Sequence, residues 1–384
     1  QAVDVMPFRL ALLAWLPALV AGMPTFYINL DLPPRKRWTE VATYYRNEIA
    51  AMAESLSPIV NKRLGMAREA WLEVAHYDKD VEEEMHGFVE ALNYSDISFD
   101  RMRLHSLLYE MASPTMACSG VLWAMRNGTV VHGRNMDYDF PFKMPDGRLL
   151  NWPDITYQAV FVRGGEPLIK ATSWPGAIGF HTAMRIGGWS FEQNTRSGKN
   201  EWHENLKAAQ QGGQVYSLVV RRVLESVPNF EEAVQQLYST KFMAPSYFIM
   251  SGAGKGEGAV LSIDRLGVHE PSTPPIQRVN LAEWHLVQTN DDLLHEPMDL
   301  RRPVANAKLA SAAQADATPE QLMQFMKSSP LFNEGTVFTT LMVPATGFYK
   351  TLIRDEDVAL APKPVSLIRA LRGKRRLQEA ITAP

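Results

Sequence analysis

The stretch PTMACSGVLWAMRNGTVVHGRNMDYDF, from Pro114 to Phe140, decides how this chain is organised. It contains Cys118, the only cysteine among 384 residues, and two runs that are rich in apolar and β-branched residues. Between the runs stands the pair Asn127-Gly128, and Asn-Gly is the strongest two-residue signal for a β-hairpin turn. The sequence therefore predicts two antiparallel strands, at residues 118–125 and 129–138.

The turn also predicts which residues lie near the thiol. A two-residue turn folds the second strand back along the first, so HGRNMD (residues 132–137) is expected beside the strand start that carries Cys118. Arg134 and Asp137 would then converge with the thiol at one end of the hairpin. A nearby cation favours the thiolate, which is the nucleophile, and a carboxylate can orient a base. Taken singly, these residues also have structural explanations: a free thiol often packs as a small apolar group, and Arg-x-x-Asp is often an ion pair at a strand end.

A cut in the backbone would complete this site. If the chain is cleaved between Ala117 and Cys118, the freed α-amine has a pKa of about 8 and can take the thiol proton without any histidine. We therefore predict Ala117 and Cys118 as the cleavage site and Cys118 as the nucleophile.

The rest of the chain predicts a layered α+β body. Residues 34–111 repeat apolar positions three and four apart, which indicates helices. Further strands are predicted at residues 155–164, 246–252, 258–266, 284–290 and 336–344, and further helices at residues 216–224, 230–238 and 319–327. Strands in runs, rather than in regular alternation with helices, argue against βαβ units.

Composition excludes several classes of protein. The net charge of −3 and the pI near 6.4 give no basic field for nucleic acid. A single cysteine rules out an intramolecular disulfide, and the histidines show no spacing typical of metal ligands, so we expect neither a metal nor a cofactor. SGAGKGEGAV (residues 251–260) lacks the Ser or Thr of a phosphate-binding loop and leads into a strand, so it predicts a glycine-rich hairpin.

The two ends of the chain carry targeting signals. Arg9 precedes an apolar run at residues 10–22, which is typical of a signal peptide over residues 1–22; a short buried helix is the alternative, and Pro17 disfavours it. Asn93 and Asn127 begin acceptor sequons and are glycosylation candidates. These features favour the secretory pathway, with a lysosomal or extracellular destination. The basic segment at residues 368–380 is expected to be a solvated helix, with an anionic membrane surface as the alternative partner.

Beyond these patterns, the chain resembles the N-terminal-nucleophile cysteine hydrolases, specifically the acid ceramidase and N-acylethanolamine acid amidase family. The cysteine followed by a hairpin and HGRNMD carries the resemblance first. Other segments resemble that family in the same order: FYINLDLPPRKRW (26–38), KATSW (170–174), FEEAVQQL (230–237), APSYFIMSG (244–252), LVQTN (286–290), DLRRP (299–303) and TVFTTLMVP (336–344).

The resemblance implies an αββα sandwich and a precursor that cleaves itself into a heterodimer, with a helical α chain at residues 23–117 and a β chain at residues 118–384. It implies that Cys118 is the nucleophile and the autoprocessing residue, and that Arg134 and Asp137 position the thiol and the new α-amine. Asn290 would donate to the oxyanion, and Arg301 would complete the polar site.

The resemblance further implies a lipid amide substrate. Ceramide is favoured by INLDLPP, KATS, APSYF and VQTN, whereas EWHEN and NMDYDFPF favour a fatty acid ethanolamide. A non-catalytic lipid-binding relative is a further alternative. The chain departs from the family in lacking disulfides, in having Thr195 where an acidic residue is usual, and in having Asp291 where an aromatic residue follows TN. Residues 49–52 and 70–74 are apolar stretches that could form the mouth of an apolar groove for the acyl chain, rest on a membrane surface or pack on the β chain.

Overall fold

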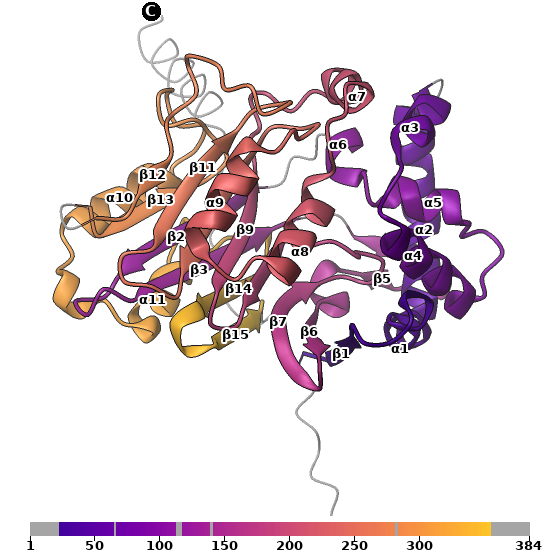
Figure 1. Ribbon diagram of the computed structural model, residues 1–384, viewed down its shortest axis with the longest axis horizontal. Coiled ribbons are helices and arrows are strands. Elements are labelled where there is room, and N and C mark those ends of the chain that lie inside the picture. The colour runs from indigo at the N-terminus through magenta and orange to yellow at the C-terminus, as the bar shows by residue number, and fades with distance from the viewer. Residues whose placement is uncertain (1–22, 65–66, 113–116, 139–140, 281–282, 355–384) are drawn as a thin grey trace, which may run out of the picture.

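The computed structural model describes residues 23–64, 67–112, 117–138, 141–280 and 283–354 (Figure 1). The predicted signal peptide (1–22) and the basic segment (368–380) lie outside the described residues. Two β-sheets pack face to face, and helices cover their outer faces (Figure 1). The predicted αββα sandwich is confirmed.

The larger sheet has eight strands. In spatial order they are β1 (Thr25–Asn29), β6 (Tyr157–Arg163), β7 (Glu166–Ser173), β8 (Thr182–Arg185), β9 (Trp189–Thr195), β10 (Ser246–Gly252), β11 (Gly258–Ile263) and β12 (Gln277–Arg278). The smaller sheet has five: β13 (His285–Gln288), β2 (Ala117–Ala124), β3 (Val130–Asp137), β14 (Thr336–Val343) and β15 (Phe348–Ile353). A separate ribbon pairs β4 (Phe142–Lys143) with β5 (Leu149–Leu150).

The predicted hairpin forms the centre of the smaller sheet. β2 pairs with β3 so that Cys118 lies opposite Met136. Gly128 has a φ of 89°, a left-handed conformation that favours glycine, and the side-chain oxygen of Asn127 accepts a hydrogen bond from the Thr129 amide at 2.9 Å. The turn chemistry thus fixes the register of the strand that carries Cys118, as the sequence predicts.

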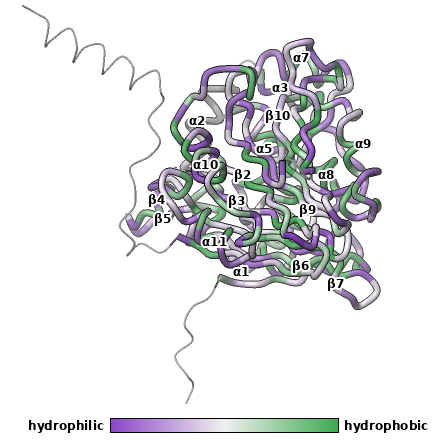
Figure 2. The backbone as a smooth tube through the Cα atoms, turned by 90° about the vertical axis from the view of Figure 1, so that its left-hand side faces the viewer, coloured by the Kyte–Doolittle hydropathy of each residue, from purple (hydrophilic) through white to green (hydrophobic). Residues whose placement is uncertain are grey.

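Alternation along the strands sends apolar side chains to both faces of each sheet. From β2, Leu122 faces the other sheet and packs with Tyr247 and Ile249, whereas Val121 and Trp123 face outward. The outward residues pack against α10 (Arg301–Ala310) and α11 (Pro319–Met326). The outer face of the larger sheet packs against α8 (Tyr216–Ser226) and α9 (Phe230–Ser239). Figure 2 shows hydrophobic residues concentrated in this interior and hydrophilic residues toward the periphery.

The N-terminal part of the described chain is mostly helical. Its helices are α1 (Thr39–Tyr44), α2 (Arg46–Leu64), α3 (Arg68–Val74), α4 (Lys79–Leu92), α5 (Phe99–His105) and α6 (Leu108–Ala112); α7 (Trp202–Gln210) lies later in the chain. The strand β1 precedes them and pairs in parallel with β6, so this part also supplies the edge of the larger sheet. That strand was missed in the sequence because it spans only five residues.

Burial tests the prediction for the two apolar stretches, and strand pairing tests the prediction for the glycine-rich segment. Ile49, Met52, Trp71 and Leu72 are buried, so the stretches at residues 49–52 and 70–74 pack inside the protein and the suggestion that they form a membrane-facing surface is wrong. The glycine-rich segment at residues 251–260 is a hairpin between β10 and β11, as predicted.

Among the helices of the described residues, none has the length and hydrophobicity needed to cross a membrane.

Candidate active site

The thiol of Cys118 is fully buried between the sheets at the start of β2. Arg134 lies on the neighbouring strand and places Nη2 at 3.7 Å from the Cys118 sulfur and 3.2 Å from the sulfur of Met136. Its Nη1 donates to the carbonyl of His181 at 2.6 Å, which fixes the direction of the guanidinium. The predicted proximity of Arg134 to the thiol is confirmed.

The backbone of Cys118 is held by Asn290 and Arg301. The amide N–H of Cys118 donates to Oδ1 of Asn290 at 2.8 Å. Arg301 donates from Nη1 to the carbonyl of Cys118 at 2.6 Å and from Nη2 to the same Asn290 oxygen at 2.8 Å. Asn290 follows β13 and Arg301 begins α10, so two segments distant in sequence meet at one residue.

Asp137 lies at the same end of the hairpin but on the other face of the sheet. It pairs across the strands with Ala117, and its carboxylate accepts hydrogen bonds from Thr336 at 2.7 Å and Asn333 at 3.0 Å. Residues three apart on a strand face opposite sides of the sheet, so Asp137 does not share the face of the Cys118 thiol as predicted. Nη1 of Arg301, at 3.7 Å from Oδ2 of Asp137, links the two faces.

Burial has the largest effect on the pKa values of the Cys118 thiol and the Asp137 carboxyl. It raises the pKa of the Cys118 thiol to about 11, although the Arg134 charge acts in the opposite direction. Burial likewise raises the pKa of Asp137 to about 6, against the effects of Arg301 and of the hydrogen bonds from Thr336 and Asn333. In the uncut chain the thiol is therefore protonated at neutral and acid pH and requires a base to react.

Asn290 holds a fixed orientation in the uncut chain. Its Nδ2 donates to the carbonyl of Thr195 at 3.0 Å, so the predicted oxyanion donor has a backbone partner here. The hydroxyl of Thr195 is buried and has no hydrogen-bond partner among the described residues. Thr195, which stands where the family usually has an acidic residue, thus contacts Asn290 through its backbone carbonyl.

A buried charge network that the sequence analysis missed supports the Asn290 loop. Arg196 binds Asp292 at 2.8 Å and Asp264 at 2.6 Å, and Arg302 binds Asp291 at 2.7 Å. The Asp291-Asp292 pair next to Asn290 could have indicated this network in the sequence, because adjacent buried carboxylates require cationic partners. Asp291 therefore has a structural role at the position that departs from the family pattern.

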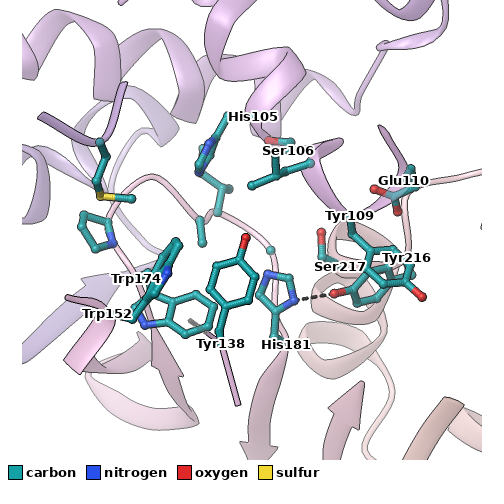
Figure 3. Close-up of a pocket in the computed structure, with 16 residues that line it drawn as sticks. His105, Ser106, Tyr109, Glu110, Tyr138, Trp152, Trp174, His181, Tyr216 and Ser217 are labelled. Atoms are coloured by element: carbon teal, nitrogen blue, oxygen red, sulfur yellow. Dashed lines mark hydrogen bonds between the residues drawn. The ribbon is translucent and has the colours of Figure 1, made fainter. Parts of the chain in front are cut away.

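A cavity of about 70 Å³ is lined by residues of α5, α6 and α8 and by aromatic side chains between the strands (Figure 3). The rings of Tyr138, Trp152 and Trp174 lie together on one side of it (Figure 3). His181 lines the same cavity, and its carbonyl binds the arginine that contacts the thiol. The described residues contain no group of three or more His, Cys, Asp or Glu side chains arranged to hold a metal ion.

This combination defines a class of protein. A cysteine at the start of β2 in an αββα sandwich, with its nitrogen, carbonyl and sulfur each contacted by a polar side chain, fits the fold and the cysteine site expected of N-terminal-nucleophile hydrolases.

Comparisons with known proteins support the predicted family. A family profile described as the beta subunit of N-acylethanolamine-hydrolyzing acid amidase matches residues 22–77. Acid ceramidase of Homo sapiens is 29% identical over 371 residues, and that of Pan troglodytes is 28% identical over 371 residues, each alignment covering 88% of both chains. A solved structure of a Caenorhabditis elegans N-acylethanolamine-hydrolyzing acid amidase ortholog is 27% identical, with a TM-score of 0.53, and covers 62% of this chain and 100% of that chain. The chain is similar to the acid ceramidase and N-acylethanolamine acid amidase family, whose members are amide-hydrolysing enzymes, and these matches support the predicted family and enzyme class.

Proposed function

We propose that the protein hydrolyses the amide bond of long-chain N-acyl lipids, converting ceramide to a sphingoid base and a fatty acid, with Cys118 as an N-terminal nucleophile formed by self-cleavage. The observation that carries the proposal is the hydrogen bond from the Cys118 nitrogen to Asn290. This nitrogen becomes the α-amine after cleavage, and its partner is in place before the cut.

Self-cleavage begins with the thiol of Cys118 and the preceding carbonyl. The sulfur attacks the carbonyl carbon of Ala117, the bond from that carbon to the Cys118 nitrogen breaks, and the thiol proton passes to the departing nitrogen. Water then hydrolyses the resulting thioester, which leaves a carboxylate on Ala117 and a free α-amine on Cys118. The products are the α chain, residues 23–117, and the β chain, residues 118–384.

Turnover of the substrate uses the new amine as the base. The α-amine takes the thiol proton, the thiolate attacks the amide carbonyl, the amine returns the proton to the leaving nitrogen, and water hydrolyses the thioester. Arg134 stabilises the thiolate, while Arg301 and Asp137 position the Cys118 backbone and its amine. Nδ2 of Asn290 exchanges the Thr195 carbonyl for the oxyanion, an interaction worth about 3–4 kcal/mol.

Export through the secretory pathway to a lysosomal or extracellular site accompanies this proposal, with residues 1–22 as the signal peptide. Asn93 and Asn127 are both exposed, which an attached glycan requires. An anionic membrane surface, as the source of the lipid substrate, is proposed as a partner of the heterodimer.

Fatty acid ethanolamides are the second candidate substrate. The likeness to the Caenorhabditis elegans ortholog favours them, whereas the acid ceramidases, whose alignments extend over 88% of this chain, favour ceramide. Both substrates require the same cysteine chemistry and differ only in the amine portion.

The test measures kcat/KM at acid pH for a ceramide and an N-acylethanolamine with the same acyl chain. We expect hydrolysis of both with a higher value for the ceramide, and no hydrolysis of either by Cys118→Ala. A higher value for the ethanolamide would assign the second substrate, and hydrolysis by Cys118→Ala would contradict the proposed nucleophile.

A further inference from the structure

The side-chain carboxyl group of Glu110 is buried without a partner. Glu110 lies on α6 and is fully buried, and neither carboxyl oxygen has a hydrogen-bond partner among the described residues. Its backbone carbonyl accepts a hydrogen bond from Asn205 at 2.8 Å. Against the larger effect of burial, the backbone amides of Glu110 and Tyr216 act to lower the pKa of the carboxyl, but neither has the distance and angle of an ordinary hydrogen bond to it. Buried polar side chains almost always have a partner, so an isolated carboxyl group requires an explanation.

The surroundings of this carboxyl suggest what the partner would be. Glu110 lines the cavity that His181 also lines, together with Ser106 and Ser217 (Figure 3). The aromatic group of Tyr138, Trp152 and Trp174 lines another part of the same cavity. The space thus has a polar portion and an apolar portion, which suits a ligand with a small polar group on a carbon chain.

The cavity wall is electrically neutral. Burial raises the pKa of Glu110 to about 8, so below that pH the group is a carboxylic acid that can both donate and accept a hydrogen bond. Burial lowers the pKa of His105 to about 4 and that of His181 to about 3, so both imidazoles are uncharged at neutral pH. A neutral wall of donors and acceptors suits a hydroxyl group better than an ion.

A chain of contacts connects this wall to the nucleophile. The Tyr216 hydroxyl hydrogen-bonds to Nδ1 of His181 and, at 3.0 Å, to Gln193. The carbonyl of His181 holds Arg134, and Arg134 contacts the Cys118 sulfur. His181 thus lines the cavity with its side chain and binds, through its carbonyl, the arginine at Cys118, so this cavity is the one assigned here to one portion of a substrate whose amide lies at Cys118.

We propose that Glu110 is a specificity-determining residue that hydrogen-bonds a hydroxyl group on the amine portion of the substrate. The inference rests on the proposed function. The acyl chain of a lipid amide has no hydrogen-bonding group to offer, whereas both candidate amines, a sphingoid base and ethanolamine, carry hydroxyl groups. The amine portion is thus the one that satisfies the carboxyl group, with its carbons against the aromatic rings.

The test compares two substrates that differ by one hydroxyl group, an N-acylethanolamine and the N-acylethylamine with the same acyl chain. Wild-type protein is expected to prefer the ethanolamide by about tenfold or more in kcat/KM, because a site built to bind a hydroxyl group discriminates against the analogue that lacks it. Glu110→Leu, of similar size, should lose that preference by slowing the ethanolamide alone. Glu110→Gln, which still donates and accepts, should retain most of it.

Thermal unfolding checks that each variant is folded, and Glu110→Met replaces the leucine variant if that one does not fold. An equal loss on both substrates would show a structural role and overturn the inference, as would a wild-type ratio near one. If wild-type protein hydrolyses the ethylamide and the ethanolamide alike, the proposed amidase function stands while this inference fails. If it hydrolyses no lipid amide at all, both fail.

Discussion

Three atoms of Cys118 are held by three side chains: the nitrogen by Asn290, the carbonyl by Arg301 and the sulfur by Arg134. Arg134 was predictable from the residues alone, because the Asn-Gly turn fixes the register of the hairpin. Asn290 and Arg301 were reached only through family resemblance, because no local pattern brings a loop after β13 and the first turn of α10 to the same strand. Glu110 was missed, since a single acidic residue in a helical segment normally faces solvent.

Asp137→Asn should slow turnover while preserving the fold. The amide is nearly isosteric with the carboxylate and can still accept a hydrogen bond from Thr336, but it lacks the charge that attracts Arg301 and orients the α-amine. We expect kcat to fall by about tenfold to a hundredfold, within the range of acid–base contributions. Single-turnover assays on a soluble amide measure this, and an unchanged kcat would leave Asp137 with only a structural role.

The same residue should make folding stability depend on pH. Its pKa is about 6 in the folded chain, above the ordinary value of 3.8 that applies to the unfolded chain. The unfolded state therefore loses its proton first, so this carboxyl lowers the free energy of unfolding as the pH rises from about 4 to about 6, by roughly 3 kcal/mol. Asp137→Asn should lack this contribution. The measurement is urea unfolding at about pH 4 and about pH 6 of the Cys118→Ala protein with and without Asp137→Asn. The same pH dependence of stability with and without Asp137→Asn would contradict the claim that burial raises the pKa of Asp137.

At the scale of single elements, the hairpin that carries Cys118 is fixed against β9. An added Cβ at Gly120 would lie 2.8 Å from a carboxylate oxygen of Glu192. That carboxylate is buried and binds Nε2 of His132 at 2.9 Å, so it cannot move away without breaking the contact. Because Gly120 has no side chain, Glu192 of the larger sheet has room to hydrogen-bond His132 of the smaller sheet.

Gly120→Ala should therefore destabilise the protein by about 1–3 kcal/mol, the usual cost of overpacking a core. Gly198→Ala is the matched control, since an added Cβ there meets no atom within 4 Å. Chemical denaturation of both variants is the measurement, and equal stability for the two would show that Glu192 rearranges freely.

Elements with regular patterns were predictable, and elements with buried polar residues were not. β10, α8, α9 and α11 follow the apolar periodicity of the sequence closely. β9, with the sequence WSFEQNT, is entirely buried although most of its residues are polar. Its Ser190 and Glu192 bind His132 across the sheets, so tertiary partners rather than alternation account for its burial.

At the scale of the whole molecule, the two proposed chains are joined without a disulfide, because the sequence has one cysteine. The strand β1 of the N-terminal part extends the sheet of the C-terminal part. Nearby, Glu84 accepts hydrogen bonds from both Nη1 and Nη2 of Arg221, at 2.5 and 2.7 Å, and from Trp38 at 2.6 Å. Burial alone would raise the pKa of Glu84, but Arg221 and the hydrogen bonds hold it below its usual value.

Glu84→Gln should therefore lower the free energy of unfolding of the uncut Cys118→Ala protein by about 3–5 kcal/mol, because it leaves the Arg221 charge buried with a weakened partner. Glu83→Gln, which removes an exposed carboxylate paired with Arg35, is the control and should have little effect. Urea midpoints that match for the two variants would show that the Glu84 cluster does not hold the two parts together.

The measurement that tests the central claim most directly is intact mass, with N-terminal sequencing, of purified protein held at acid pH. The account predicts that the full chain is replaced by two chains, that one of them begins at Cys118, and that this conversion accompanies the appearance of lipid amidase activity. Cys118→Ala should remain a single chain under the same conditions. A single uncut chain that hydrolyses lipid amides at full rate would contradict the account.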